Sequence, residues 1–225
     1  MLLVRLVLIF SYNIDLDGAE FTFVHYIQQL LKGQPLYLDP ESFPYSAIIY
    51  TPLNLYTVYG ICKLFNVDYV FDVHTIFIIG RCVSFICVIG CLYFITKIVR
   101  FYTNKKWIIV YSIFVFLVII SGHMYAFRPD SMKMLFFILF FYFFLNYFFF
   151  KQKQQHFWWI ILFANLAFLA KQDAIVYIFL ILSINCCYQR NFKSFFILLA
   201  TGICCVITIV LLQFVFGKHC LVNLF

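Results

Sequence analysis

Apolar runs long enough to cross a lipid bilayer recur along this chain. The sequence is 65% hydrophobic and only 11% charged, and its mean hydropathy is +0.99. Soluble domains carry about 25% charged residues, so a chain with so few charges could not cover a water-facing surface. A hydrocarbon core of about 30 Å needs roughly 20 apolar residues per helix. The sequence therefore predicts an all-α, polytopic transmembrane helical bundle.

We expect a single transmembrane domain over residues 1–225. Its spans are predicted at about residues 75–96, 107–121, 134–150, 157–170, 174–187 and 195–216. The apolar run from Phe157 to Cys187 is interrupted by Lys171-Gln172-Asp173. This interruption favours two short helices that meet at a polar tip, with a single long bent helix as the alternative. The total number of spans stays open.

Residues 13–73, which precede the first clear span, form the most polar part of the chain. Apolar residues at helical spacing predict an amphipathic helix from about Ala19 to Lys32, ended by Gly33. A second apolar segment, Ala47 to Phe65, is interrupted early by Pro52. We interpret it as a helix that lies on or dips into the membrane surface, with a full span as the alternative. The bundle is thus expected to have a large first outer loop containing amphipathic helices.

The first apolar run, Met1 to Tyr12, is shorter than the roughly 20 residues of a spanning helix. It also lacks the small-residue cleavage site of a signal peptide. These features favour the expectation that the sequence is a fragment of a longer protein.

The distribution of charges is consistent with this order of spans. With the loop after Thr96 in the cytoplasm, the cytoplasmic loops hold basic residues and no acid, as the positive-inside rule prefers. The net charge of +7 therefore reflects the orientation of the chain in the membrane, and no nucleic-acid partner is expected. The cytoplasmic basic residues are Lys97, Arg100, Lys105, Lys106, Lys151, Lys153, Arg190 and Lys193.

Nine cysteines occur, most of them inside apolar runs. A thiol in such a run behaves as a small hydrophobic side chain, so a disulfide framework is not expected for most of them. No pair of cysteines has the spacing of a zinc site.

Three polar clusters stand out on the predicted outer side. They are Asp15, Asp17 and Glu20; Arg128-Pro129-Asp130-Ser131; and Lys171-Gln172-Asp173. Ionisable groups at or inside a membrane are costly, and they usually mark a polar cavity or a substrate path.

Each cluster also has a structural interpretation. Asp17 and Glu20 have the spacing of a capping box, with Asp17 as N-cap and Glu20 at N3. Pro129 and Asp130 suit a helix N-terminus. Lys171 and Asp173 could form an ordinary solvated turn, and Asp68 and Asp72 a solvated loop.

The order of the motifs resembles that of the GT-C superfamily of membrane glycosyltransferases. The series consists of Asp17-Gly18-Ala19-Glu20, Gly33-Gln34-Pro35-Leu36-Tyr37, Tyr50-Thr51-Pro52-Leu53, Arg81, Arg128-x-Asp130-Ser131 and Lys171-Gln172. The superfamily includes the protein O-mannosyltransferases and the bacterial aminoarabinose transferases. The resemblance covers about residues 13–174.

This resemblance implies transfer of a sugar from a polyprenyl-phosphate carrier to an acceptor on the outer or lumenal face of a bacterial inner, plasma or endoplasmic reticulum membrane. By motif position, Asp17 is the general base on the acceptor hydroxyl and Glu20 its catalytic partner. Arg128, Asp130, Lys171 and Gln172 are the implied substrate-binding residues. Some relatives use a divalent metal near the acids, for which Asp17 and Glu20 could supply oxygen ligands.

Two other functions are compatible with the sequence. The chain could be a catalytically inactive remnant or a membrane subunit that keeps the transferase scaffold. A small transporter is also conceivable, although its polar groups should line the middle of the spans.

Overall fold

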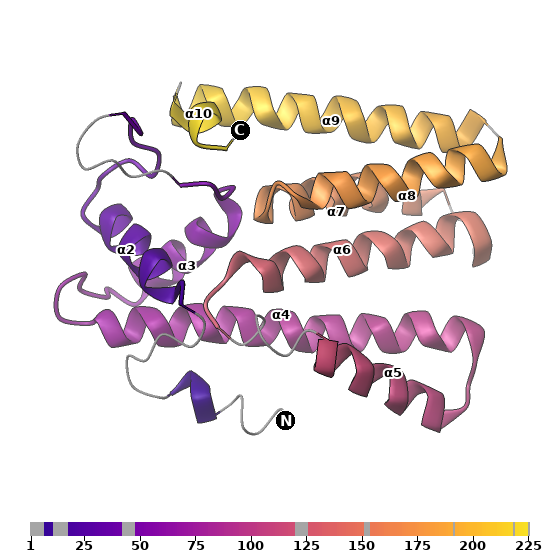
Figure 1. Ribbon diagram of the computed structural model, residues 1–225, viewed down its shortest axis with the longest axis horizontal. Helices are drawn as coiled ribbons and strands as arrows, with labels where there is room; N and C mark the ends of the chain where they lie inside the picture. Colours follow the sequence, from indigo (N-terminus) through magenta and orange to yellow (C-terminus); the bar gives the residue numbers. More distant parts are fainter. Residues whose placement is uncertain are drawn as a thin grey trace. The chain divides into compact units, whose positions relative to one another are not determined.

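The computed structural model describes residues 7–10, 18–41, 48–119, 126–150, 154–190, 192–217 and 219–224. Throughout these ranges the regular secondary structure is helical, and they contain no strand. The helices are α2 (Glu20–Leu31), α3 (Leu53–Leu64), α4 (Val73–Tyr102), α5 (Lys106–Ile119), α6 (Pro129–Leu145), the π-helix η1 (Asn146–Phe150), α7 (Gln155–Ala170), α8 (Ala174–Gln189), α9 (Phe192–Phe216) and α10 (His219–Leu224) (Figure 1). The predicted all-α class is confirmed.

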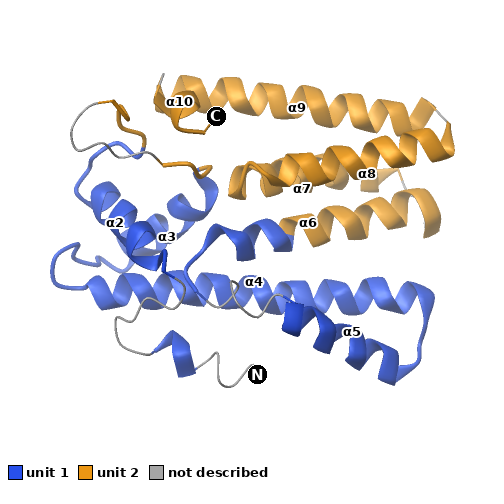
Figure 2. Cartoon of the chain, viewed as in Figure 1, with its two compact units in different colours: residues 1–36, 52–135 blue, residues 37–51, 136–225 orange. Residues whose placement is uncertain are grey.

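The chain divides into two compact units (Figure 2). Unit 1 comprises residues 1–36 and 52–135, and unit 2 comprises residues 37–51 and 136–225. Unit 1 therefore holds α2 to α5 and the start of α6. Unit 2 holds the rest of α6 and all later helices.

In unit 1, helix α2 agrees with the amphipathic helix predicted for residues 19–32. It ends because Gly33 adopts a positive φ of 78°, which glycine reaches without steric cost. The amide of Gln34 then donates to the carbonyl of Gln29, which closes the helix as a Schellman motif. Helix α2 packs against α3 and α4, and α4 packs against α5.

In unit 2, helices α7, α8 and α9 pack against one another along their lengths (Figure 1). The chain leaves α7 after Ala170 and begins α8 at Ala174. The interruption Lys171-Gln172-Asp173 thus separates two helices, as predicted, and no single bent helix forms there. The short helix α10 packs against α9.

Among the described residues, three helical stretches are long and apolar enough to cross a membrane. They are Val73–Tyr102, Pro129–Phe150 and Phe192–Phe216. They coincide with the predicted spans 75–96, 134–150 and 195–216. Helices α5, α7 and α8, at the other predicted spans, are apolar but have only 14, 16 and 16 residues. At 1.5 Å per residue they reach about 21–24 Å, less than a hydrocarbon core of about 30 Å.

All nine cysteines are free thiols. Five of them, Cys62, Cys87, Cys91, Cys205 and Cys220, are buried among helices. Among the cysteines that lie inside apolar runs, Cys87, Cys91 and Cys205 are thus placed as small apolar side chains.

Candidate functional site

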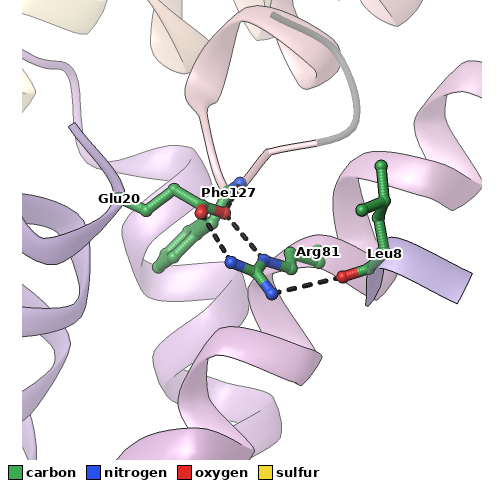
Figure 3. Close-up of polar contacts among 4 residues, drawn as sticks. All are labelled: Leu8, Glu20, Arg81 and Phe127. Atoms are coloured by element: carbon green, nitrogen blue, oxygen red, sulfur yellow. Dashed lines mark hydrogen bonds and ion pairs between the residues drawn. The ribbon is translucent and has the colours of Figure 1, made fainter. Parts of the chain in front are cut away.

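A fully buried ion pair joins α2 to α4 in unit 1 (Figure 3). Arg81 Nε donates to Glu20 Oε1 at 2.9 Å, and an Arg81 terminal nitrogen donates to Glu20 Oε2 at 2.7 Å. Both side chains are 0% exposed. This forked arrangement is the strongest geometry for an arginine–carboxylate pair. The other Arg81 terminal nitrogen donates to the carbonyl of Leu8 at 3.3 Å.

The segment before α6 completes this cluster. The backbone amide of Phe127 donates to Glu20 Oε1 at 2.7 Å. The Phe127 ring is fully buried against α4 at Gly80, where a Cβ atom would lie 2.3 Å from the ring. Gly80 thus allows the close approach that brings the Phe127 amide to Glu20. We call Glu20, Gly80, Arg81 and Phe127 the acid–arginine cluster.

The capping-box interpretation of Asp17 and Glu20 is wrong. Helix α2 begins at Glu20, and its N-cap is Ala19, whose side chain makes no capping hydrogen bond. Glu20 is therefore the first helical residue rather than N3. Its carboxylate is occupied by Arg81 and Phe127, so it cannot reach back to the N-cap amide as a capping box requires.

Asp15 and Asp17 lie outside the described residues, so the structure says nothing of the predicted general base. Glu20, three positions after Asp17, does not fit a metal ligand as placed. Both oxygens of its carboxylate already accept hydrogen bonds. Oε1 accepts from Arg81 and from the Phe127 amide, and Oε2 accepts from Arg81. Within the described ranges, no group of three His, Cys, Asp or Glu side chains could hold a metal ion.

The motif Arg128-Pro129-Asp130-Ser131 lies at the start of α6, in unit 1. Helix α6 begins at Pro129, as predicted, and Asp130 lies in its first turn. Asp130 forms an ion pair with Lys133 at 3.3 Å, and the buried Ser131 hydroxyl donates to the carbonyl of Arg128 at 3.0 Å. Arg128 itself is partly exposed. Because it is the neighbour of Phe127, its backbone is held next to the acid–arginine cluster.

A second polar cluster lies in unit 2, where the Tyr50-Thr51 motif meets the tip between α7 and α8. The buried Thr51 hydroxyl donates to the carbonyl of Phe168 at 3.0 Å. That carbonyl belongs to the last turn of α7, where helical carbonyls lack partners within the helix. Gln172 Nε2 donates to the carbonyl of Ile49. The Lys171 ammonium lies 5.7 Å from the centre of the Tyr50 ring.

Asn223, on α10, forms hydrogen bonds with the segment that leads into Tyr50-Thr51. Its Oδ1 accepts the amide of Ile48 at 2.9 Å, and its Nδ2 donates to the carbonyl of Leu38 at 2.9 Å. Upstream, the Tyr37 hydroxyl donates to the carbonyl of Tyr50 at 2.8 Å. We call residues 48–51, with the side chains of Tyr37, Gln172 and Asn223 that bind them, the threonine strap.

The predicted site residues thus fall into two groups. Glu20, Arg128 and Asp130 belong to unit 1, and Lys171 and Gln172 to unit 2. Sequence reasoning assigned no role to Gly80, Phe127 or Asn223. A glycine beside Arg81 is a weak signal of close packing, and a single asparagine near the chain end carries no signal.

Comparisons with protein-family models, with curated proteins and with solved structures give no match to this chain.

Proposed function

We propose that the chain is a multi-pass membrane glycosyltransferase similar to the GT-C superfamily. In this proposal it moves a sugar from a polyprenyl-phosphate carrier to an acceptor at the outer or lumenal face. The shorter helices α5, α7 and α8 span as well, and local thinning of the bilayer accommodates their length. The positive-inside distribution of basic residues supports this topology.

One observation carries the proposal: within each unit, segments that lie far apart in the sequence contact one another. The acid motif at Glu20, the arginine of α4 and the segment before Arg128 converge in the acid–arginine cluster. The Tyr50-Thr51 and Lys171-Gln172 motifs converge in the threonine strap. Glu20, Arg81, Tyr50-Thr51 and Lys171-Gln172 belong to the series that resembles the transferases, and the convergence within each unit supports the proposal.

The proposed reaction is a single displacement. The acceptor oxygen attacks the anomeric carbon, and its proton passes to the Asp17 carboxylate. The bond between the anomeric carbon and the phosphate oxygen breaks, and its electron pair stays on the phosphate. The products are the glycosylated acceptor, with inverted configuration, and free polyprenyl phosphate.

Glu20 takes a positioning role in this proposal rather than direct contact with substrate. Its carboxylate is fully buried and paired with Arg81, so an acceptor hydroxyl has no access to it. Its contacts with Arg81 and Phe127 fix the start of α2 against α4 and the segment before α6. As the resemblance implies, the partly exposed Arg128 and Lys171 are each candidate cations for the leaving phosphate, and Asp130 and Gln172 are candidate substrate-binding residues.

The test is release of polyprenyl phosphate from its mannosyl, glucosyl and aminoarabinosyl forms by the full chain in lipid vesicles. A membrane extract supplies the acceptor. Asp17→Asn should abolish release at unchanged fold, whereas the matched control Asp39→Asn, in the same predicted outer loop, should retain it. Equal release by both variants would refute the catalytic assignment.

One observation favours the alternative that the chain is a catalytically inactive scaffold. The Glu20–Arg81 pair is completely buried, and a protein with a purely structural role could contain such a pair. It predicts no release from any donor and no stabilisation of the wild-type chain by polyprenyl phosphate. Movement of the intact labelled donor across the vesicle membrane, with its sugar–phosphate bond unbroken, would instead indicate transport.

A further inference from the structure

The turn between α3 and α4 presents a group of large apolar side chains to its surroundings. Phe71 is 87% exposed, Leu64 76%, Phe65 69% and Val70 55%. We call these four residues the turn patch. Single exposed apolar residues are ordinary, whereas several large ones on the same turn favour an interaction surface.

Hydrogen bonds within the turn hold this patch in a defined shape. The Asp68 carboxylate accepts the amides of Val70 at 2.7 Å and Phe71 at 3.0 Å. The Asp72 carboxylate accepts the amide of Asp68 at 3.0 Å. The amides of Phe71 and Val70, in that order of effect, lower the pKa of Asp68, so this exposed carboxylate stays ionised. The backbone amides of Asp68, Val70 and Phe71 therefore find partners within the turn itself.

The inner side of the turn is fixed to α2 and α3. Val67 is buried, and its amide donates to the carbonyl of Cys62 at 3.0 Å. The Gln28 side chain donates to the carbonyl of Tyr69 at 2.6 Å, and the Lys32 ammonium lies 5.2 Å from the centre of the Tyr69 ring. With this side engaged, the turn patch is held facing outward.

The position of the turn in the chain indicates what covers the patch. Phe71 lies two residues before α4, which is one of the helices long and apolar enough to cross a membrane. Within α4, the rise from Val73 to Ile76, where its apolar part begins, is only about 4.5 Å. The turn therefore lies near the boundary between hydrocarbon and headgroups, where aromatic side chains are enriched.

We propose that the turn patch is an interfacial anchor, which inserts Leu64, Phe65, Val70 and Phe71 into the bilayer that α4 crosses. This inference rests on the membrane placement in the proposed function but not on its transferase chemistry. Asp68 and Asp72 remain at the headgroup level, where ionised groups are solvated. The anchor fixes the depth of α4 and, through Tyr69, the position of α2 against the membrane surface.

The test places a tryptophan in the patch of a full chain whose native Trp107, Trp158 and Trp159 are changed to Phe. Phe71→Trp is compared with Asn104→Trp, at an exposed polar position beyond the other end of α4. Both variants are reconstituted in phosphatidylcholine vesicles with and without bromine atoms on the acyl chains. Quenching by bromine requires contact between the indole and the lipid chains. Val70→Trp is a second probe of the patch should Phe71→Trp fail to fold.

The anchor predicts that emission from the patch variant is shifted to the blue and is quenched at least twofold more by brominated lipid than emission from Asn104→Trp. Emission typical of water would overturn the proposal. So would an indole protected from a soluble quencher but not quenched by brominated lipid, since a protein would then cover the patch. The wild-type chain tests the membrane placement separately: quenching of its native tryptophans, including the 70% exposed Trp158, shows that the helices are inserted whatever the patch does.

Discussion

The acid–arginine cluster and the threonine strap both hold together segments that lie far apart in the sequence, but they do so with different chemistry. In unit 1, a carboxylate and a guanidinium separated by 61 positions in sequence are paired in a fully buried site. In unit 2, neutral hydroxyl and amide groups bind the backbone of residues 48–51. Burying charges is costly unless they are paired, whereas buried neutral groups need only a hydrogen-bond partner. The charged cluster should therefore tolerate loss of a single partner much less well.

The largest effect is expected from Arg81→Leu, because it leaves the Glu20 carboxylate buried without its cation. Removal of one partner from a buried pair costs about 3–5 kcal/mol of unfolding free energy. The double variant Glu20→Gln with Arg81→Leu should recover part of this loss, since no charge then stays buried. Thermal unfolding in detergent measures both. If the double variant is less stable than Arg81→Leu alone, the pair is not the dominant interaction of this cluster.

The next effect concerns how closely Phe127 approaches α4. Gly80→Ala places a methyl group 2.3 Å from the Phe127 ring and should cost about 1–3 kcal/mol through overpacking. The matched control is Gly202→Ala in α9 of unit 2, where the nearest atom, on Phe179, is 3.4 Å away. It should stay within about 1 kcal/mol of wild type, because a gain in helix propensity offsets the slight crowding. Equal destabilisation by the two alanines would argue against close packing at Gly80.

A loss of similar size is expected from Asn223→Ala, which removes the partners of Ile48 and Leu38 in the threonine strap. Leaving buried backbone groups without partners costs about 1–3 kcal/mol. Hydrogen exchange at the Ile48 amide should rise with the loss of stability. Asn104→Ala, at an exposed position, is the control and should leave both quantities unchanged.

The smallest effect is expected from Thr51→Val, which keeps the side-chain shape and removes the hydroxyl that donates to the carbonyl of Phe168. The net loss should be about 0.5–1.5 kcal/mol, the usual contribution of one hydrogen bond. Thr96→Val is matched to it, because the Thr96 hydroxyl donates only to Leu92, one turn earlier in its own helix. If Thr96→Val proves as costly as Thr51→Val in thermal unfolding, the bond to α7 has no special role.

The same contrast explains how far the sequence predicts the structure. Periodicity and run length predicted the helices well, including the break at Lys171-Gln172-Asp173, because apolar length and polar interruption are local properties. Charged residues in apolar surroundings, such as Arg81, are visible in the sequence because they need a partner. The identity of that partner, Glu20, depends on tertiary packing, and the capping-box interpretation failed for this reason.

The threonine strap was not predictable. A neutral residue such as Asn223 causes no conflict with its sequence neighbours, so nothing in the pattern indicates that it binds a segment about 175 positions away. The role of Gly80 was hidden similarly, since its close contact is made by Phe127 from another element.

Binding of polyprenyl phosphate, the product common to every donor sugar, tests the central claim most directly. The measurement is the thermal unfolding temperature of the wild-type chain in detergent with undecaprenyl phosphate, dolichyl phosphate or undecaprenol. A lipid that binds the folded state at 100 times its dissociation constant stabilises it by about 2.7 kcal/mol. We expect the unfolding temperature to rise with at least one of the phosphates, to stay unchanged with undecaprenol, and to rise less in Arg128→Gln and Lys171→Gln. No shift with either phosphate, or the same shift with undecaprenol, would contradict the central claim.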